Sequence, residues 1–172
     1  MERFLKTALA AAEAASAETM KYYRGAFEVE LKEDQTPVTV ADRRAEDIIR
    51  DRLLGAFPEH GFFGEETGRT QDDADYLWLV DPIDGTKGFV RQYPFFSTQI
   101  ALMHNGEIVL GVSSAPMMKE LAWAEKGVVN PPPAGRCRHR RPPAVRADDF
   151  GPVGALHQCV ARAARQRDRT GP

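Results

Sequence analysis

The sequence predicts an α+β domain in which a pair of helices packs in a layer on an antiparallel sheet. Two amphipathic segments, residues 2–24 and 40–57, come first in the chain. Short runs of β-forming residues follow between residues 61 and 125, and an Asn105-Gly106 pair separates two of them. Helices grouped before strands are typical of an α+β arrangement. The length of 172 residues suits one domain with a sizeable core.

Both helices are predicted from apolar residues that recur at helical spacing. The first covers residues 2–24 and is rich in alanine, the strongest helix former. The second starts at Thr39 or Val40 and runs to about Phe57, where Pro58 ends it. A polar loop, residues 31–37, joins them. The two apolar stripes are Phe4, Leu5, Ala8, Leu9, Ala12 and Ala15, then Ala41, Ala45, Ile48, Ile49 and Leu53.

The strands are predicted from short apolar and β-branched runs. Residues 61–64 form a short strand, and a polar loop, residues 68–75, leads to a buried strand at 76–80. We expect this strand to stop at Asp81-Pro82, because proline cannot donate to a ladder. Residues 90–94 are expected to form a short helix and turn. A meander of strands follows at 97–104, 107–114 and 121–125, with Asn105-Gly106 as the hairpin turn.

Carboxylates cluster around the end of the buried strand, in Asp81-Pro-Ile-Asp84-Gly85-Thr86. If the strand before Glu65 is a neighbour, Glu65 joins Asp81 and Asp84. Three carboxylates together repel one another unless cations neutralise them, and hard divalent cations prefer such oxygens. Asp84-Gly85-Thr86 is expected to form a tight turn that opens a helix, and the backbone N–H groups at the start of that helix favour an anion. Metal and phosphate together indicate metal-assisted phosphoryl chemistry, although an isolated Asp-x-x-Asp is more often part of a turn.

The longer pattern resembles the signature of the inositol monophosphatase family, the Mg²⁺-dependent, lithium-sensitive phosphatases. It consists of Asp81-Pro-Ile-Asp84-Gly-Thr86 after a buried strand, with Gly64-Glu65-Glu66 and Thr39-Val-Ala-Asp42 upstream. The resemblance covers residues 1–127. It implies a layered α/β sandwich of the inositol monophosphatase and sugar phosphatase type, with the C-terminal half absent. It also implies a homodimer that hydrolyses a small phosphate monoester.

The resemblance implies a role for each residue of the motifs. The metal ligands would be the Glu65, Asp81 and Asp84 carboxylates and the Ile83 carbonyl, with Mg²⁺, or alternatively Mn²⁺, as the cofactor and Li⁺ as an inhibitor. The catalytic residues would be Asp42, Thr86 and Glu65. The substrate phosphate would lie at Asp84 and at the N–H groups of Gly85 and Thr86.

Two assignments stay open at the sequence level. On the residues alone, Asp42 is a first-turn carboxylate favoured by the helix dipole, whereas the family pairs it with Thr86. The preceding loop of the family carries a further lysine or acidic residue near the metals, for which Lys32 and Asp34 are candidates.

Several substrates are compatible with the motifs. Residues 36–42, 57–66 and 95–102 look most like the bacterial histidinol-phosphatase branch, with inositol monophosphate close behind. Lys87-Gly88-Phe89 is similar to the 3′(2′),5′-bisphosphate nucleotidase branch. The family's downstream Trp-Asp motif has no counterpart after Trp123. We therefore expect impaired activity, or a non-catalytic remnant that serves as an interaction module.

The composition changes abruptly near Gly127. Residues 1–127 hold 14 Lys and Arg and 22 Asp and Glu, a net charge of −8, whereas residues 128–172 hold 9 Arg, no Lys and 3 Asp, a net charge of +6. The second segment also has 7 of the 12 prolines. We therefore divide the chain into a phosphatase domain, 1–127, and an Arg/Pro-rich tail, 128–172, that we expect to be disordered or translated from a shifted frame. An arginine-rich tail can also bind nucleic acid, but no aromatic residues interleave the arginines.

Composition also indicates the cellular compartment in which we expect the protein. The sequence has no apolar run long enough to span a bilayer and no signal-peptide pattern, so we expect a cytoplasmic protein. The two cysteines, Cys137 and Cys159, are too few for a disulfide framework or a zinc site and are expected to be ordinary thiols. The whole-chain net charge of −2 gives no argument for binding to nucleic acid or a membrane.

Overall fold

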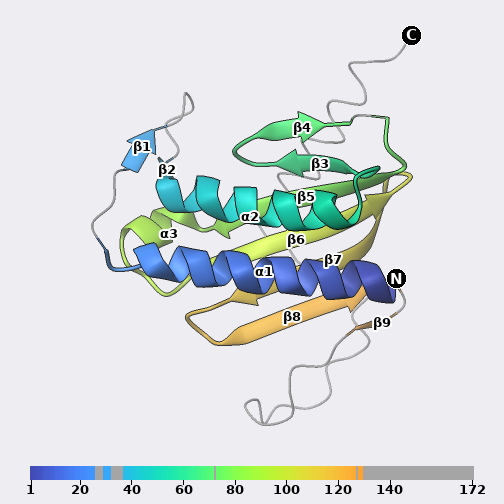
Figure 1. Cartoon of the computed structure of the whole chain (residues 1–172). Helices are drawn as coiled ribbons and strands as arrows, with labels where there is room; N and C mark the ends of the chain where they lie inside the picture. The colour runs from blue at the N-terminus through green and yellow to red at the C-terminus, as the bar shows by residue number, and fades with distance from the viewer. Residues whose placement is uncertain (26–28, 32–36, 72, 127, 130–172) are drawn as a thin grey trace.

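A computed structural model describes residues 1–25, 29–31, 37–71, 73–126 and 128–129 (Figure 1). It contains three α-helices, a two-stranded sheet and a seven-stranded sheet among these residues. The order of the larger sheet is β4-β3-β5-β6-β7-β8-β9. The bounds are α1 Glu2–Tyr22, β1 Val29–Leu31, β2 Pro37–Thr39, α2 Val40–Ala56, β3 Gly61–Gly64, β4 Gly68–Thr70, β5 Tyr76–Asp84, α3 Thr86–Val90, β6 Ser97–His104, β7 Glu107–Ala115, β8 Glu120–Glu125 and β9 Val128–Val129.

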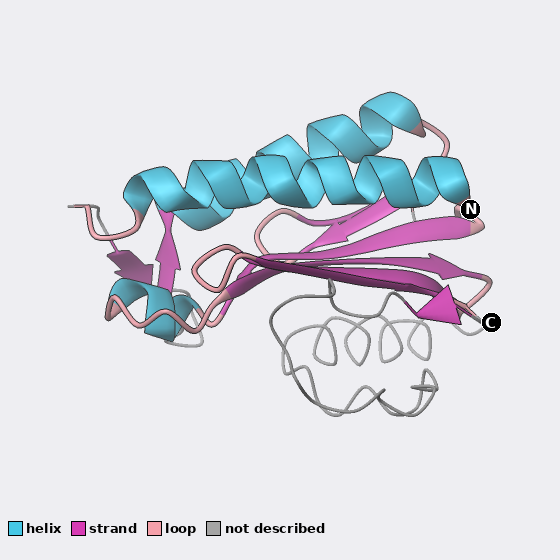
Figure 2. Cartoon of the chain, turned by 90° about the horizontal axis from the view of Figure 1, so that it is seen from below, coloured by secondary structure: helices cyan, strands magenta, loops and turns pink. Residues whose placement is uncertain are grey.

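The long helices α1 and α2 lie side by side over one face of the larger sheet (Figure 2). Their predicted apolar stripes form this layer: alanines of α1 are fully buried, as are Ile49 and Leu53 of α2. Opposite them the sheet contributes Trp78, Val80 and Ile100 to the same core. Small alanine side chains let the α1 backbone approach the sheet closely, so large residues of the strands fill the space between the layers. The predicted α+β layering is therefore confirmed.

The sheet is mixed and not wholly antiparallel as the sequence predicted. β3 and β5 run parallel, with Gly64 opposite Val80, whereas the other neighbours in this sheet are antiparallel. The expected polar loop at residues 68–75 contains β4, which pairs with the outer edge of β3. The chain therefore turns back along β3 before it returns on the other side as β5. A three-residue edge strand carries too little periodicity to be recognised from sequence.

Strand β5 is longer than predicted, and a helix opens after it at the turn Asp84-Gly85-Thr86, as expected. β5 continues through Pro82 to Asp84. The register against β6 shifts between Asp81 and Asp84, so no ladder hydrogen bond from Pro82 is required. The Pro82 carbonyl instead accepts a hydrogen bond from the Thr98 hydroxyl at 3.0 Å. Helix α3 covers Thr86–Val90, and a turn at residues 91–92 follows it, so the further short helix expected at residues 90–94 is wrong while the turn is present.

Some of the sequence expectations fall outside the described residues. These are the candidates Lys32 and Asp34 and almost all of the predicted tail, including both cysteines. Strand β9, Val128–Val129, follows the expected boundary at residue 127 and pairs with β8. None of the helices in the described ranges combines the length and apolar composition needed to cross a membrane.

Candidate active site

The parallel pairing of β3 with β5 brings the predicted acidic residues to one edge of the sheet. Gly64, the last residue of β3, lies opposite Val80 of β5. The Glu65 N–H donates to the Val80 carbonyl at 3.1 Å. Glu65 and Asp81 therefore follow equivalent positions on adjacent strands, as the sequence predicted for neighbouring strands.

Four carboxylates lie close enough to affect one another's protonation. Asp81 is 2 % exposed, and its burial, the charge of Glu65 and a hydrogen bond with Glu65 raise its pKa to about 10, with smaller contributions from Asp84 and Asp42. Burial and then Glu65 raise the pKa of Asp84. Burial also raises the pKa of Asp42, against the hydrogen bonds that it accepts. The site thus gathers carboxyl groups whose pKa values are raised, so that without a cation they favour holding protons.

Asp42 both caps a helix and contacts Thr86. The Thr39 N–H donates to Asp42 Oδ2 at 2.8 Å, and the Thr39 hydroxyl accepts from the Asp42 N–H at 3.4 Å, which together form a capping box at the start of α2. The Thr86 hydroxyl lies 3.2 Å from Asp42 Oδ1 and 3.0 Å from the Ile83 carbonyl. The helix-end role expected from the sequence and the pairing with Thr86 implied by the resemblance are therefore both present.

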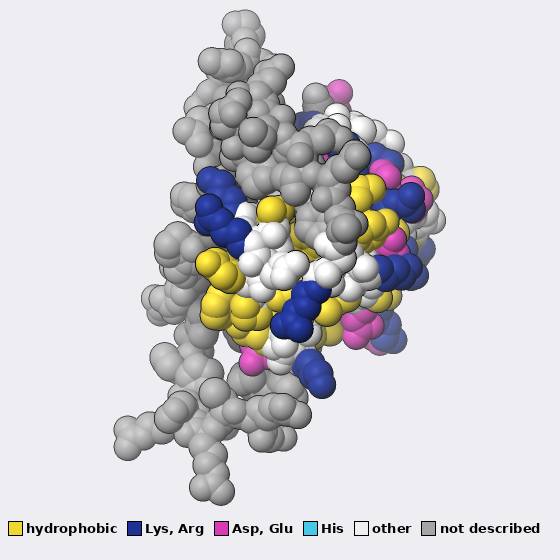
Figure 3. All heavy atoms as spheres, turned by 90° about the vertical axis from the view of Figure 1, so that its left-hand side faces the viewer, with side chains coloured by type: hydrophobic (Ala, Val, Ile, Leu, Met, Phe, Trp, Pro, Cys, Tyr) yellow, Lys and Arg dark blue, Asp and Glu magenta, His cyan; other side chains and the backbone are white. Residues whose placement is uncertain are grey.

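Gly85 shapes the turn between β5 and α3. Its φ of 96° lies in the left-handed region, which favours glycine. A Cβ atom there would lie 2.8 Å from the Phe95 carbonyl oxygen, so the loop before β6 packs directly on this turn. The same loop exposes Tyr93 and Phe95, which are 55 % and 69 % accessible. Figure 3 shows the end of the molecule where β1, β2 and α3 lie, with hydrophobic and basic side chains at its surface.

The carboxylates of Glu65, Asp81 and Asp84 are ligands of the kind that hard divalent cations prefer, but they do not surround a common point. Within the described residues, no three His, Cys, Asp or Glu side chains are placed to hold a metal ion as they stand. Asp81 Oδ1 is buried and has no hydrogen-bond partner among the described residues. A buried carboxylate oxygen without a partner is costly, and a cation would satisfy it.

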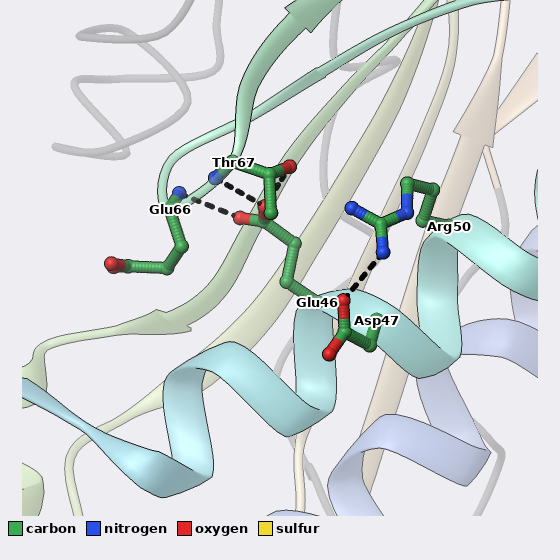
Figure 4. A network of polar contacts seen from close by, with 5 residues as sticks. All are labelled: Glu46, Asp47, Arg50, Glu66 and Thr67. Atoms are coloured by element: carbon green, nitrogen blue, oxygen red, sulfur yellow. Dashed lines mark hydrogen bonds and ion pairs between the residues drawn. The ribbon is translucent and has the colours of Figure 1, made fainter.

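One residue at this edge was not predicted from the sequence. Glu46 of α2 is 0 % exposed, and its carboxylate accepts hydrogen bonds from Glu66 and Thr67 in the turn after β3 (Figure 4). Helical spacing could have revealed it, because Glu46 follows Asp42 by four residues and lies next to the buried Ala45. The apolar stripe was predicted without the acidic residue beside it.

Comparison with known proteins identifies the family. The chain matches the inositol monophosphatase family over residues 1–161. The match extends past residue 127, where the resemblance read from the motifs was expected to end. Among curated relatives, the chain is 42% identical over 124 residues to a histidinol-phosphatase of Chlorobaculum parvum, a stretch that is 72% of this chain and 48% of the relative. It is 45% identical over 102 residues to an inositol-1-monophosphatase of Mesorhizobium japonicum, 59% of this chain and 38% of the relative.

Solved structures lead to the same family. The extragenic suppressor protein suhB of Bartonella henselae superposes with a TM-score of 0.72 at 36% identity, covering 78% of this chain and 53% of that one. An inositol monophosphatase (IMPase) of Thermotoga maritima gives a TM-score of 0.72 at 33% identity, covering 81% of this chain and 54% of that one. This chain thus spans about half the length of these structures, and less than half of the curated relatives. With its layered fold and its motifs, the chain belongs to the inositol monophosphatase family.

Proposed function

We propose that this chain carries the catalytic carboxylates of a magnesium-dependent phosphate monoesterase. The observation that supports this is the meeting of Glu65, Asp81 and Asp84 at the ends of two parallel strands, with Asp42 of α2 beside the Thr86 hydroxyl. Carboxylates that are buried together raise the free energy of the folded chain unless protons or cations neutralise them. The family is generally metal-dependent, which agrees with a cation at this place.

Glu65, Asp81 and Asp84 and the Ile83 carbonyl would hold the metal. Bound Mg²⁺ would act as a Lewis acid on the phosphoryl group and lower the pKa of water. The N–H groups of Gly85 and Thr86 would orient the phosphate oxygens.

Thr86 and Asp42 provide a route for a proton. The Thr86 hydroxyl would accept a hydrogen bond from the attacking water and pass a proton toward Asp42 Oδ1, 3.2 Å away. Glu65 is a second acceptor at the same edge of the sheet.

Histidinol phosphate and inositol monophosphate are the substrates we favour. The relatives that support this choice are named histidinol-phosphatase and inositol-1-monophosphatase. Adenosine 3′,5′-bisphosphate is the alternative, from the similarity around Lys87-Gly88-Phe89. We further propose a cytoplasmic location, a homodimer and inhibition by Li⁺.

A non-catalytic role is the second candidate. The matched stretch is only 48% of the histidinol-phosphatase and 38% of the inositol-1-monophosphatase. Ligands and substrate contacts that those proteins carry outside the matched region have no assigned counterpart here. Such a chain would keep the fold and the acidic edge and act as an interaction module without turnover.

Calorimetric titration with Mg²⁺ and Mn²⁺ tests the metal centre. The wild-type chain should bind, and Asp81→Asn should bind at least about tenfold more weakly, because it removes a buried carboxylate ligand. Asp75→Asn is the matched control, since Asp75 is exposed just before the first residue of the same strand and should leave binding unchanged. Equal binding by wild type and Asp81→Asn would refute the site. Metal-dependent turnover of an aryl phosphate then separates the enzyme from the interaction module, and the three named substrates separate the branches.

A further inference from the structure

A single buried carboxylate holds the turn that carries Glu65. Glu46 Oε2 accepts from the Glu66 N–H at 2.8 Å. Glu46 Oε1 accepts from the Thr67 N–H at 2.7 Å and from the Thr67 hydroxyl at 2.6 Å. Both oxygens are therefore used, and Figure 4 shows the carboxylate of α2 pointing into the turn after β3. Hydrogen bonds from N–H groups to an ionised carboxylate are among the stronger ones in proteins.

The backbone of Glu65 is held from two sides. Its own N–H donates to the Val80 carbonyl of β5 at 3.1 Å. The next two N–H groups, of Glu66 and Thr67, donate to Glu46 on α2. Two neighbouring elements thus set the direction of the chain immediately before and after the Glu65 side chain.

Gly64 makes room for this arrangement. A Cβ atom on Gly64 would lie 2.3 Å from Glu46 Oε1 and 2.7 Å from Glu46 Oε2. The Glu46 carboxylate therefore occupies the place where any other residue at position 64 would put its side chain. The close approach shows that Gly64, Glu46 and the turn form one packed unit.

We infer that Glu46 is a positioning residue for the metal centre: by fixing the 65–67 turn, it would orient Glu65 as a ligand of the cation that Asp81 would also bind. This inference rests on the proposed function, because the orientation of Glu65 affects metal affinity only if Glu65 is a metal ligand. Glu46 itself is directed at the backbone of the turn and is not proposed as a ligand. Partners that orient a metal ligand typically change metal affinity by about 10- to 100-fold when they are replaced.

The test is Mg²⁺ and Mn²⁺ titration of Glu46→Gln, under conditions where circular dichroism shows a folded chain. The amide keeps the shape but presents an NH₂ group to one of the N–H donors, so the metal concentration at half-saturation should rise about tenfold. Asp47→Asn is the matched control: it makes the same chemical change at the next residue, whose side chain is 52 % accessible and pairs with Arg50 at 2.6 Å. This control should titrate as wild type does.

Thr67 provides an independent variant in case Glu46→Gln does not fold. Thr67→Val removes one of the three hydrogen bonds to Glu46 and should weaken metal binding about fivefold, whereas Thr67→Ser keeps the hydroxyl and should restore wild-type affinity. A purely structural role would lower stability and leave the affinity of the folded protein unchanged. Unchanged affinity in Glu46→Gln, or in Thr67→Val if the first does not fold, overturns the inference while the metal centre stands. Failure of the wild-type chain to bind metal overturns both.

Discussion

At the level of single residues, Gly64 shows how closely the site is packed. Gly64→Ala would bring a Cβ atom to 2.3 Å from the Glu46 carboxylate, so we expect the free energy of unfolding to fall by about 1–3 kcal/mol. Gly55→Ala is the control, because a Cβ there meets no atom within 4 Å and the residue lies in α2. We expect Gly55→Ala to stabilise the chain by about 0.4–1 kcal/mol. Urea unfolding measures both, and a neutral Gly64→Ala would contradict the packing described.

His60 makes stability depend on pH. Its ring is 2 % exposed and stacks between Phe57 and Tyr76, and this burial lowers its pKa from the usual 6.5, although the charge of Glu59 opposes the shift. The unfolded chain therefore binds the proton more readily than the folded chain. The free energy of unfolding should be fully retained above pH 6.5 and should fall as the pH drops from 6.5 toward the lowered pKa, by at most about 1.4 kcal/mol per pH unit.

Replacing His60 with phenylalanine isolates this contribution. His60→Phe keeps an aromatic ring in the stack and removes the titration. Urea unfolding at pH 7.5 and pH 5.5 should show a larger loss for wild type than for His60→Phe. Equal losses in the two proteins would show that His60 does not titrate differently on folding.

At the level of elements, residues at the start of α2 both stabilise the helix and contact the candidate active site. Thr39 caps the helix through the Ala41 N–H, and Asp42 in the first turn accepts the Thr39 N–H while facing the Thr86 hydroxyl. Thr39→Ala should lower the free energy of unfolding by about 1 kcal/mol, because the first N–H groups of the helix lose their side-chain acceptor. Thr39→Ser should keep most of this energy. Chemical denaturation of both variants decides the point, and an unchanged Thr39→Ala would mean that the cap contributes nothing.

Elements with a clear period were predicted well, and short or irregular ones were not. The α1 and α2 stripes and the β6–β7 hairpin agree with the structure within a few residues. β4 and the extension of β5 past Pro82 were missed, because a three-residue strand and a bulge leave no periodic signal.

At the level of the whole molecule, the matched length limits the expected activity. The chain covers 53% and 54% of the solved relatives, so nearly half of the length of each has no counterpart in the matched region. We expect metal-dependent turnover far below the roughly 10 per second typical of enzymes. A steady-state assay at saturating Mg²⁺, with Asp81→Asn as the background, measures it. Turnover at the ordinary rate would show that the residues of this chain suffice for full activity.

The sequence by itself determined the helices, most strands and the identity of the acidic residues, because amphipathic periods and short motifs are local properties of the chain. Only the tertiary structure decided that β3 lies parallel to β5 and that Glu46 reaches the Glu66 and Thr67 amides. Glu46 and Thr67 are 21 residues apart, and each residue alone reads as an ordinary polar side chain. A buried carboxylate is tolerable only where distant donors converge on it, and that convergence is set by how helix and sheet pack and not by the local sequence of either.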